Sequence, residues 1–104
     1  EENVLFNKTS KEVFNQIRGL NSWPGAYAVL DDKNIKLWSS IVSKNKYNEV
    51  PGTIINLDKN GLEVVTKDSS ILITMLQLPG KKKMSIKDFI NGNKKEDYVG
   101  KCFK

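Results

Sequence analysis

The chain has 104 residues, of which 38% are hydrophobic and 28% charged, a composition typical of one water-soluble domain. No stretch approaches the roughly 20 consecutive apolar residues that span a bilayer. The sequence has no His and a single Cys, Cys102, which removes the commonest general base, the commonest zinc ligand and any internal disulfide. We therefore expect no catalytic residue, no cofactor-binding residue and no metal site in this chain, and we expect a cytoplasmic monomer. Because the chain starts at Glu1 without an initiator Met, we also expect it to be part of a longer protein.

The formal charge of +5 is concentrated at the C-terminal end. Residues 1–80 hold nine basic and nine acidic side chains, whereas residues 81–104 hold eight Lys and three acidic side chains. A localised basic surface attracts polyanions, so the partner classes are nucleic acid and an anionic membrane. The membrane is the weaker alternative, because Phe89 and Ile90 offer little apolar area to insert.

The first element is a helix expected over residues 10–20. Thr9 and Glu12 have the spacing of a capping box at its start. An apolar stripe at helical spacing follows: Val13, Phe14, Ile17 and Leu20. Arg18 is expected to point outward near the helix end, and Trp23-Pro-Gly25 then forms a corner into the next element, with Trp23 in a packing role.

The middle of the chain changes to short strands separated by turn residues. We expect them at 26–30, 35–43, 53–57, 62–66 and 71–78. In the second strand Ile35, Leu37 and Ile41 should alternate with Lys36, Trp38 and Val42, and Pro51-Gly52 should form a type II turn. This pattern predicts a mainly β fold, a small open Greek-key barrel of about five strands. It is similar to an oligonucleotide-binding (OB) fold, but the helix usual between its third and fourth strands is replaced by residues 58–61.

A short second helix is expected at residues 85–91, capped by Ser85 with Asp88 and ended by Gly92. Beyond it, residues 93–97 should be solvated. For the apolar side chains that follow, Tyr98, Val99 and Phe103, packing against the domain and mobility remain alternatives.

The run Lys81-Lys82-Lys83 is the main candidate binding feature. Such a run is often only a solvated loop, but this one lies between a Pro-Gly turn and a capped helix, where several phosphates can be engaged. Two aromatic residues interleaved with lysines, Trp38 and Tyr47, are a second and weaker sign of a nucleic-acid surface. The other basic residues that charge and placement add to this surface are Arg18, Lys36, Lys44, Lys46 and Lys87.

As a set, these landmarks resemble the C-terminal domain of the methionyl-tRNA formyltransferase family, in family order and over nearly the whole chain. The matching segments are Ile17-Arg-Gly-Leu-Asn21, Trp23-Pro-Gly-Ala26, Pro51-Gly-Thr53, Leu76-Gln77, Pro79-Gly-Lys-Lys82, Met84, Asp88-Phe89 and Asn91-Gly92. Two positions depart from the family pattern, since Gly19 stands where Ala is more frequent and Ser22 where Pro is.

The resemblance implies a single C-terminal domain, residues 1–104, of an enzyme whose Rossmann-like catalytic domain lies N-terminal to it. The parent enzyme would transfer a formyl group from 10-formyltetrahydrofolate to initiator methionyl-tRNA in bacterial translation initiation. This domain would hold the tRNA, a role that Lys81, Lys82 and Lys83 match most directly. Two alternatives stay open: the C-terminal domain of a sugar-nucleotide formyltransferase, and a free-standing barrel that binds single-stranded nucleic acid with exposed Trp38 and Tyr47.

Overall fold

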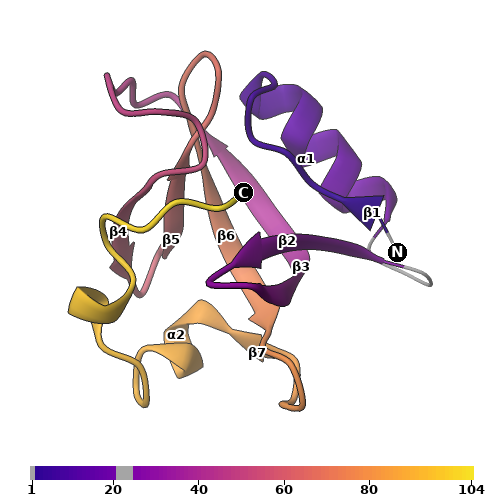
Figure 1. The fold of residues 1–104 in the computed structure, drawn as a ribbon, viewed down its shortest axis with the longest axis vertical. Coiled ribbons are helices and arrows are strands. Elements are labelled where there is room, and N and C mark those ends of the chain that lie inside the picture. The colour runs from indigo at the N-terminus through magenta and orange to yellow at the C-terminus, as the bar shows by residue number, and fades with distance from the viewer. Residues whose placement is uncertain (1, 21–24) are drawn as a thin grey trace.

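The structure, a computed structural model, describes residues 2–20 and 25–104. A curved β-sheet dominates it, and a helix near the N-terminus of the chain packs against this sheet (Figure 1). The elements in chain order are β1 (Glu2–Asn3), α1 (Ser10–Gly19), β2 (Ala26–Leu30), β3 (Lys33–Ser43), β4 (Ile54–Asp58), β5 (Gly61–Val65), β6 (Ser70–Gln77), β7 (Met84–Ser85), α2 (Ile86–Phe89) and the 3-10 helix η1 (Lys95–Asp97). The predicted mainly β fold, with an N-terminal helix and a short C-terminal helix, is confirmed. The Trp23-Pro24 part of the predicted corner lies outside the described residues.

The sheet has the strand order β1-β2-β3-β6-β5-β4, with β7 paired to β6. Strands β3, β4, β5 and β6 lie in the order 3-6-5-4, which is the Greek-key arrangement that the sequence predicts. Within the described residues the structure has seven strands where five were predicted. The two additional strands, β1 and β7, are only two residues long, too short to give a pattern in the sequence.

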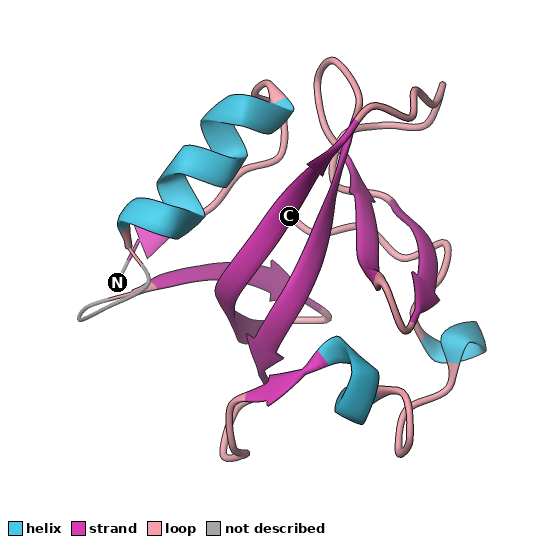
Figure 2. Ribbon diagram, turned by 180° about the vertical axis from the view of Figure 1, so that it is seen from behind, coloured by secondary structure: helices cyan, strands magenta, loops and turns pink. Residues whose placement is uncertain are grey.

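Helix α1 forms where its caps and its apolar stripe predict. The Glu12 amide donates to Thr9 Oγ1 at 3.1 Å, and the Thr9 amide donates to Glu12 Oε1 at 3.0 Å, so both halves of the capping box are present. Val13 and Ile17 are fully buried, and the helix packs mainly against β3 (Figure 2). A second polar anchor, from the Ser10 amide to Asp68 Oδ1 at 2.8 Å, fixes the helix start to the loop before β6.

The predicted alternation of residues along the second strand is wrong after Leu37. The pairing of β3 with β6 shifts register twice, between Leu37 and Ser39 and between Ser39 and Ser40. The first irregularity places an extra residue in β3 and the second places one in β6; beyond them Ile41 and Val42 are both exposed, at 55% and 41%, while Ile35 and Leu37 stay buried. The long strand therefore bends around the core instead of alternating regularly over its length.

The C-terminal segment packs against the sheet, which decides between the two alternatives for it. Its backbone follows the outer edge of β4, with the Ile54 amide donating to Lys101 O at 2.8 Å and the Phe103 amide donating to Gly52 O at 2.9 Å. The Lys104 amide then donates to Val29 O on β2 at 2.9 Å. Residues 100–104 thus bridge the opening between β4 and β2 (Figure 1).

The side chain of Phe103 fills the interior beside this bridge. It is 4% exposed, and its ring centroid lies 5.2 Å from that of Phe6. Gly52 makes the close approach possible, because its φ of +100° fits the predicted type II turn and a Cβ there would lie 2.7 Å from Phe103 O. The Thr53 amide closes that turn onto Val50 O at 3.1 Å.

The second predicted helix, residues 85–91, is shorter in the structure and covers Ile86–Phe89. Ser85 caps it as predicted, accepting from the Asp88 amide at 3.2 Å. Ile86 and Phe89 are 1% exposed and join the core formed by β2 to β6. The short helix therefore anchors the chain directly after the lysine run, at the lower end of the molecule in Figure 1.

Candidate nucleic-acid interface

The loop that carries Lys81, Lys82 and Lys83, named here the lysine loop, is anchored to the sheet by Gln77 at the end of β6. Gln77 Nε2 donates to the Lys81 carbonyl at 2.9 Å, and Trp38 Nε1 on β3 donates to Gln77 Oε1 at 3.1 Å. The Lys81 amide also donates to Leu78 O at 3.0 Å, which closes the turn before the loop. One glutamine thus fixes the backbone of the loop and the orientation of the indole, while all three lysine side chains stay exposed.

The indole of Trp38 contacts this loop as well as the sheet. Lys83 Nζ lies 4.6 Å from the centre of the Trp38 ring, within the range of a cation-π contact. The ring is half-buried. Trp38 therefore positions the lysine loop and one of its ammonium groups.

Arg18 and Lys36 lie next to the same tryptophan. Arg18 and Trp38 line one small pocket of about 90 Å³ between α1 and β3, and the Arg18 guanidinium lies 5.8 Å from the centre of the Phe14 ring. Lys36 stands two residues before Trp38 on the same strand face, directly opposite Gln77 in the sheet register. We call the surface formed by Arg18, Lys36 and the lysine loop the basic face.

The structure does not bring all the predicted basic residues together. Lys44 and Lys46 follow the end of β3, in the segment between β3 and β4 at the upper left of Figure 1, whereas the lysine loop, between β6 and β7, lies at the bottom. Lys87 is exposed on α2, four residues beyond Lys83. The predicted set therefore divides into the basic face, a separate pair, and Lys87 on the neighbouring helix.

Tyr47, the second aromatic candidate, is tied to a buried carboxylate. Its hydroxyl donates to Glu63 Oε2 at 3.0 Å, and Ser70 Oγ donates to the same oxygen at 2.7 Å. Burial, followed by the hydrogen bond to Glu63, raises the pKa of the Tyr47 hydroxyl. Tyr47 thus fastens the loop after β3 to the sheet, 9 positions and one bulged strand away from Trp38.

Sequence reasoning missed Gln77 as a residue of the site. In the sequence Gln77 stands out only as part of the Leu76-Gln77 family motif and by its place at the end of a strand just before the lysine run. Across the described ranges, 2–20 and 25–104, no group of His, Cys, Asp and Glu side chains has the geometry of a metal site. In the same part of the chain, no helix has the length and apolar character needed to cross a membrane.

The fold and the surface together define the class of protein domain: a small mainly β domain with a Greek-key sheet and a basic face built around an anchored lysine loop. Comparison with known families then identifies it, since residues 1–94 match the family described as "Formyl transferase, C-terminal domain". The chain belongs to this family.

Curated relatives named methionyl-tRNA formyltransferase are similar over most of the chain. The relative from Macrococcus caseolyticus is 45% identical over 96 residues, which cover 92% of this chain and 30% of the relative. Those from Malacoplasma penetrans and Staphylococcus aureus are 41% and 44% identical over 93 and 94 residues, covering 89% and 88% of this chain. The chain spans 29% and 30% of these two relatives, so it corresponds to less than a third of their length.

Proposed function

We propose that the chain is the tRNA-binding C-terminal domain of a methionyl-tRNA formyltransferase and that its basic face contacts the tRNA. The observation that carries this proposal is the anchored lysine loop, in which Gln77 and Trp38 fix three consecutive lysines at one edge of the sheet. Five cations on a defined surface can each neutralise a phosphate of a folded RNA. Arg18, Lys36 and the lysine loop thereby supply affinity and orientation without reading bases.

In this proposal the formyl transfer itself takes place elsewhere in the parent enzyme. A catalytic domain N-terminal to this chain uses 10-formyltetrahydrofolate to formylate initiator methionyl-tRNA in the bacterial cytoplasm. The present domain holds the body of the tRNA so that its methionyl end reaches that catalytic domain. The names of the relatives and the family match support this division of roles.

Binding measurements at several salt concentrations test the proposal. Each phosphate neutralised adds about 0.7–0.9 to the slope of log affinity against log salt concentration. Changing Lys81, Lys82 and Lys83 together to Ala should therefore reduce that slope by about 2 to 3 and weaken tRNA binding at low salt at least about tenfold. The matched control removes three exposed lysines outside the proposed surface: Lys59, Lys94 and Lys95.

The outcome turns on the comparison between the two triple variants. The proposal predicts a large loss for the lysine-loop variant and a loss several times smaller for the control. Equal losses would mean that only the total charge matters, and no loss in the lysine-loop variant would place the tRNA on another surface. Either result overturns the proposal.

The two alternatives raised by the sequence receive less support. A sugar nucleotide carries few phosphates, so five clustered cations favour the larger polyanion. A free-standing barrel for single strands needs Trp38 and Tyr47 exposed together on one sheet face. Instead, both rings are half-buried, and each is held by its own hydrogen bond, to Gln77 and to Glu63.

A further inference from the structure

A cleft of about 360 Å³ adjoins the basic face, at the place where the C-terminal segment passes the β2–β3 turn. Its volume falls in the roughly 300–1,000 Å³ range of small-molecule sites. The apolar part of its wall comes from Leu30, Ile35, Leu78, Pro79 and Tyr98. The charged part comes from Lys33, Lys81 and Lys101 together with Asp31 and Asp97.

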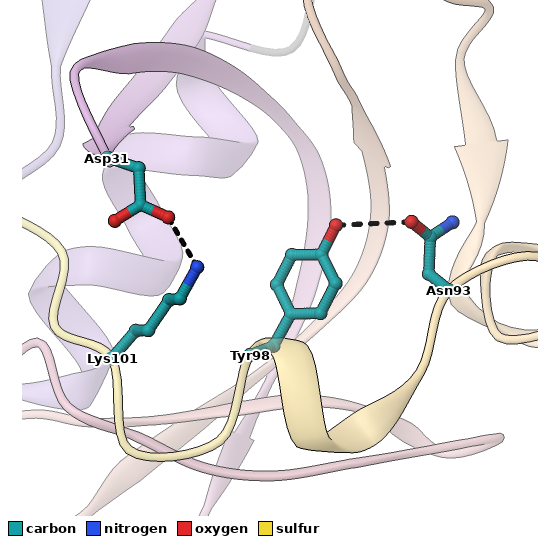
Figure 3. A network of polar contacts seen from close by, with 4 residues as sticks. All are labelled: Asp31, Asn93, Tyr98 and Lys101. Atoms are coloured by element: carbon teal, nitrogen blue, oxygen red, sulfur yellow. Dashed lines mark hydrogen bonds and ion pairs between the residues drawn. The ribbon is translucent and has the colours of Figure 1, made fainter.

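The aromatic side of the cleft is held in place from two directions. Tyr98 Oη donates to Asn93 Oδ1 at 3.1 Å (Figure 3). The Tyr98 ring also meets Phe89 edge-on, with a centroid separation of 5.4 Å. Burial raises the pKa of the Tyr98 hydroxyl, so the phenol stays neutral at physiological pH. A half-buried, fixed aromatic ring in the wall of a cleft is a suitable surface for a flat ligand.

The charges around the cleft leave two lysines for an anion. Lys101 Nζ pairs with Asp31 Oδ2 at 2.5 Å, as Figure 3 shows, and this hydrogen bond raises the pKa of Lys101. The charges of Lys101 and Asp31 therefore cancel. Two lysines, Lys33 and Lys81, and one carboxylate, Asp97, remain in the lining, so the wall carries a net positive charge.

We propose that this cleft binds one unpaired ribonucleotide, with its base on the apolar wall beside Tyr98 and its phosphate at Lys33 and Lys81. In the complex assumed under the proposed function, on which this step rests, the nucleotide belongs to the bound RNA. The cleft is continuous with the basic face, because Lys81 lines the cleft and is also the first residue of the lysine loop. An RNA bound at the basic face can therefore place one of its nucleotides in the cleft. A carboxylate such as Asp97 accepts hydrogen bonds from ribose hydroxyls and base amino groups, which gives it a role in an otherwise cationic site.

The test is a titration of the full parent protein, followed by amide NMR, with each of the four ribonucleoside 5′-monophosphates and with ribose 5-phosphate. We expect saturable shifts at residues 31–33, 78–81 and 97–101, with a dissociation constant of about 1 mM for at least one nucleotide. Ribose 5-phosphate, which lacks the base, should bind at least about fivefold more weakly, the low end of the range for stacking of one base.

Two variants of Tyr98 separate the contribution of its aromatic ring from that of its hydroxyl group. Tyr98→Phe and Tyr98→Leu both lose the hydrogen bond to Asn93, but only Tyr98→Phe keeps the aromatic surface. Tyr98→Phe should bind within about twofold of the unmodified protein, and Tyr98→Leu should bind at least about fivefold more weakly. Amide spectra without ligand verify that both variants are folded.

Three results would overturn the inference: no saturable shift at the cleft up to about 10 mM of any nucleotide, equal binding of ribose 5-phosphate, or equal binding by the two variants. Failure of the proposed function is distinguishable. Lys82 and Lys83 do not line the cleft, so changing both to Ala should weaken tRNA binding and leave mononucleotide binding within about twofold. If the cleft bound nucleotides but the protein did not bind tRNA, the proposed function would fail while nucleotide binding at the cleft would stand.

Discussion

Replacing Phe103 by Ala tests how far the C-terminal segment holds the domain together. The phenyl ring is 4% exposed and contacts Phe6 at 5.2 Å between centroids. Burial of a Phe side chain contributes about 1.5–3 kcal/mol, and an aromatic pair adds about 0.5–1.5 kcal/mol. We therefore expect Phe103→Ala to lower the free energy of unfolding by about 2–4 kcal/mol, a large part of the stability of a small domain.

Equilibrium unfolding in urea measures this loss. The slope of the free energy against urea concentration should stay unchanged, so that the midpoint alone reports the difference. Cys102→Ala changes an exposed neighbour in the same segment and should fall within about 0.5 kcal/mol of the unmodified chain. A loss below about 1 kcal/mol for Phe103→Ala would refute the view that this segment completes the core.

Three further predictions concern the turn, the acid limit of stability and the anchor of the lysine loop. Gly52→Ala should lower the free energy of unfolding by about 2 kcal/mol or more, because φ is +100° and the new Cβ would meet a carbonyl oxygen. Gly19→Ala, with open space around it, should raise the free energy of unfolding by about 0.4–1 kcal/mol, and thermal or urea unfolding measures both changes. The hydrogen bond from the Ser10 amide lowers the pKa of Asp68, so the carboxylate stabilises the fold above about pH 4 and this stabilisation is lost as the pH falls further. Asp68→Asn should make the free energy of unfolding depend less on pH below about pH 4, and an unchanged pH dependence would contradict this assignment. Gln77→Leu keeps every charge but releases the loop, so tRNA affinity should fall about threefold or more and the amides of residues 81–83 should exchange faster; unchanged exchange would show that Gln77 is not the anchor.

Much of the fold follows from local patterns in the sequence. The capping box at Thr9, the type II turn at Pro51-Gly52 and the Ser85 cap all form where residue type and spacing predict them. These features depend on contacts within three or four residues, so a single sequence contains the information. The bulges near Ser39 depend instead on how β3 and β6 bend around one core, and no local pattern marks them.

The same distinction explains what was missed at the candidate site. The lysine loop and Trp38 are visible in the sequence as charge and aromatic residues, but they lie more than 40 positions apart. Only the antiparallel pairing of β3 with β6 brings Trp38, Gln77 and Lys83 together. That pairing also separates Lys44 and Lys46 from the basic face, although in the sequence they lie closer than the lysine loop to Trp38.

The most direct test of the central claim maps where tRNA contacts this domain in the full parent protein. Amide hydrogen exchange with and without initiator tRNA should show protection at residues 81–83 and 36–38 and at the C-terminal turn of α1 around Arg18, with no comparable change at residues 59–60 and 93–96. Protection confined to residues 59–60 and 93–96, or no protection at the lysine loop, would contradict the account.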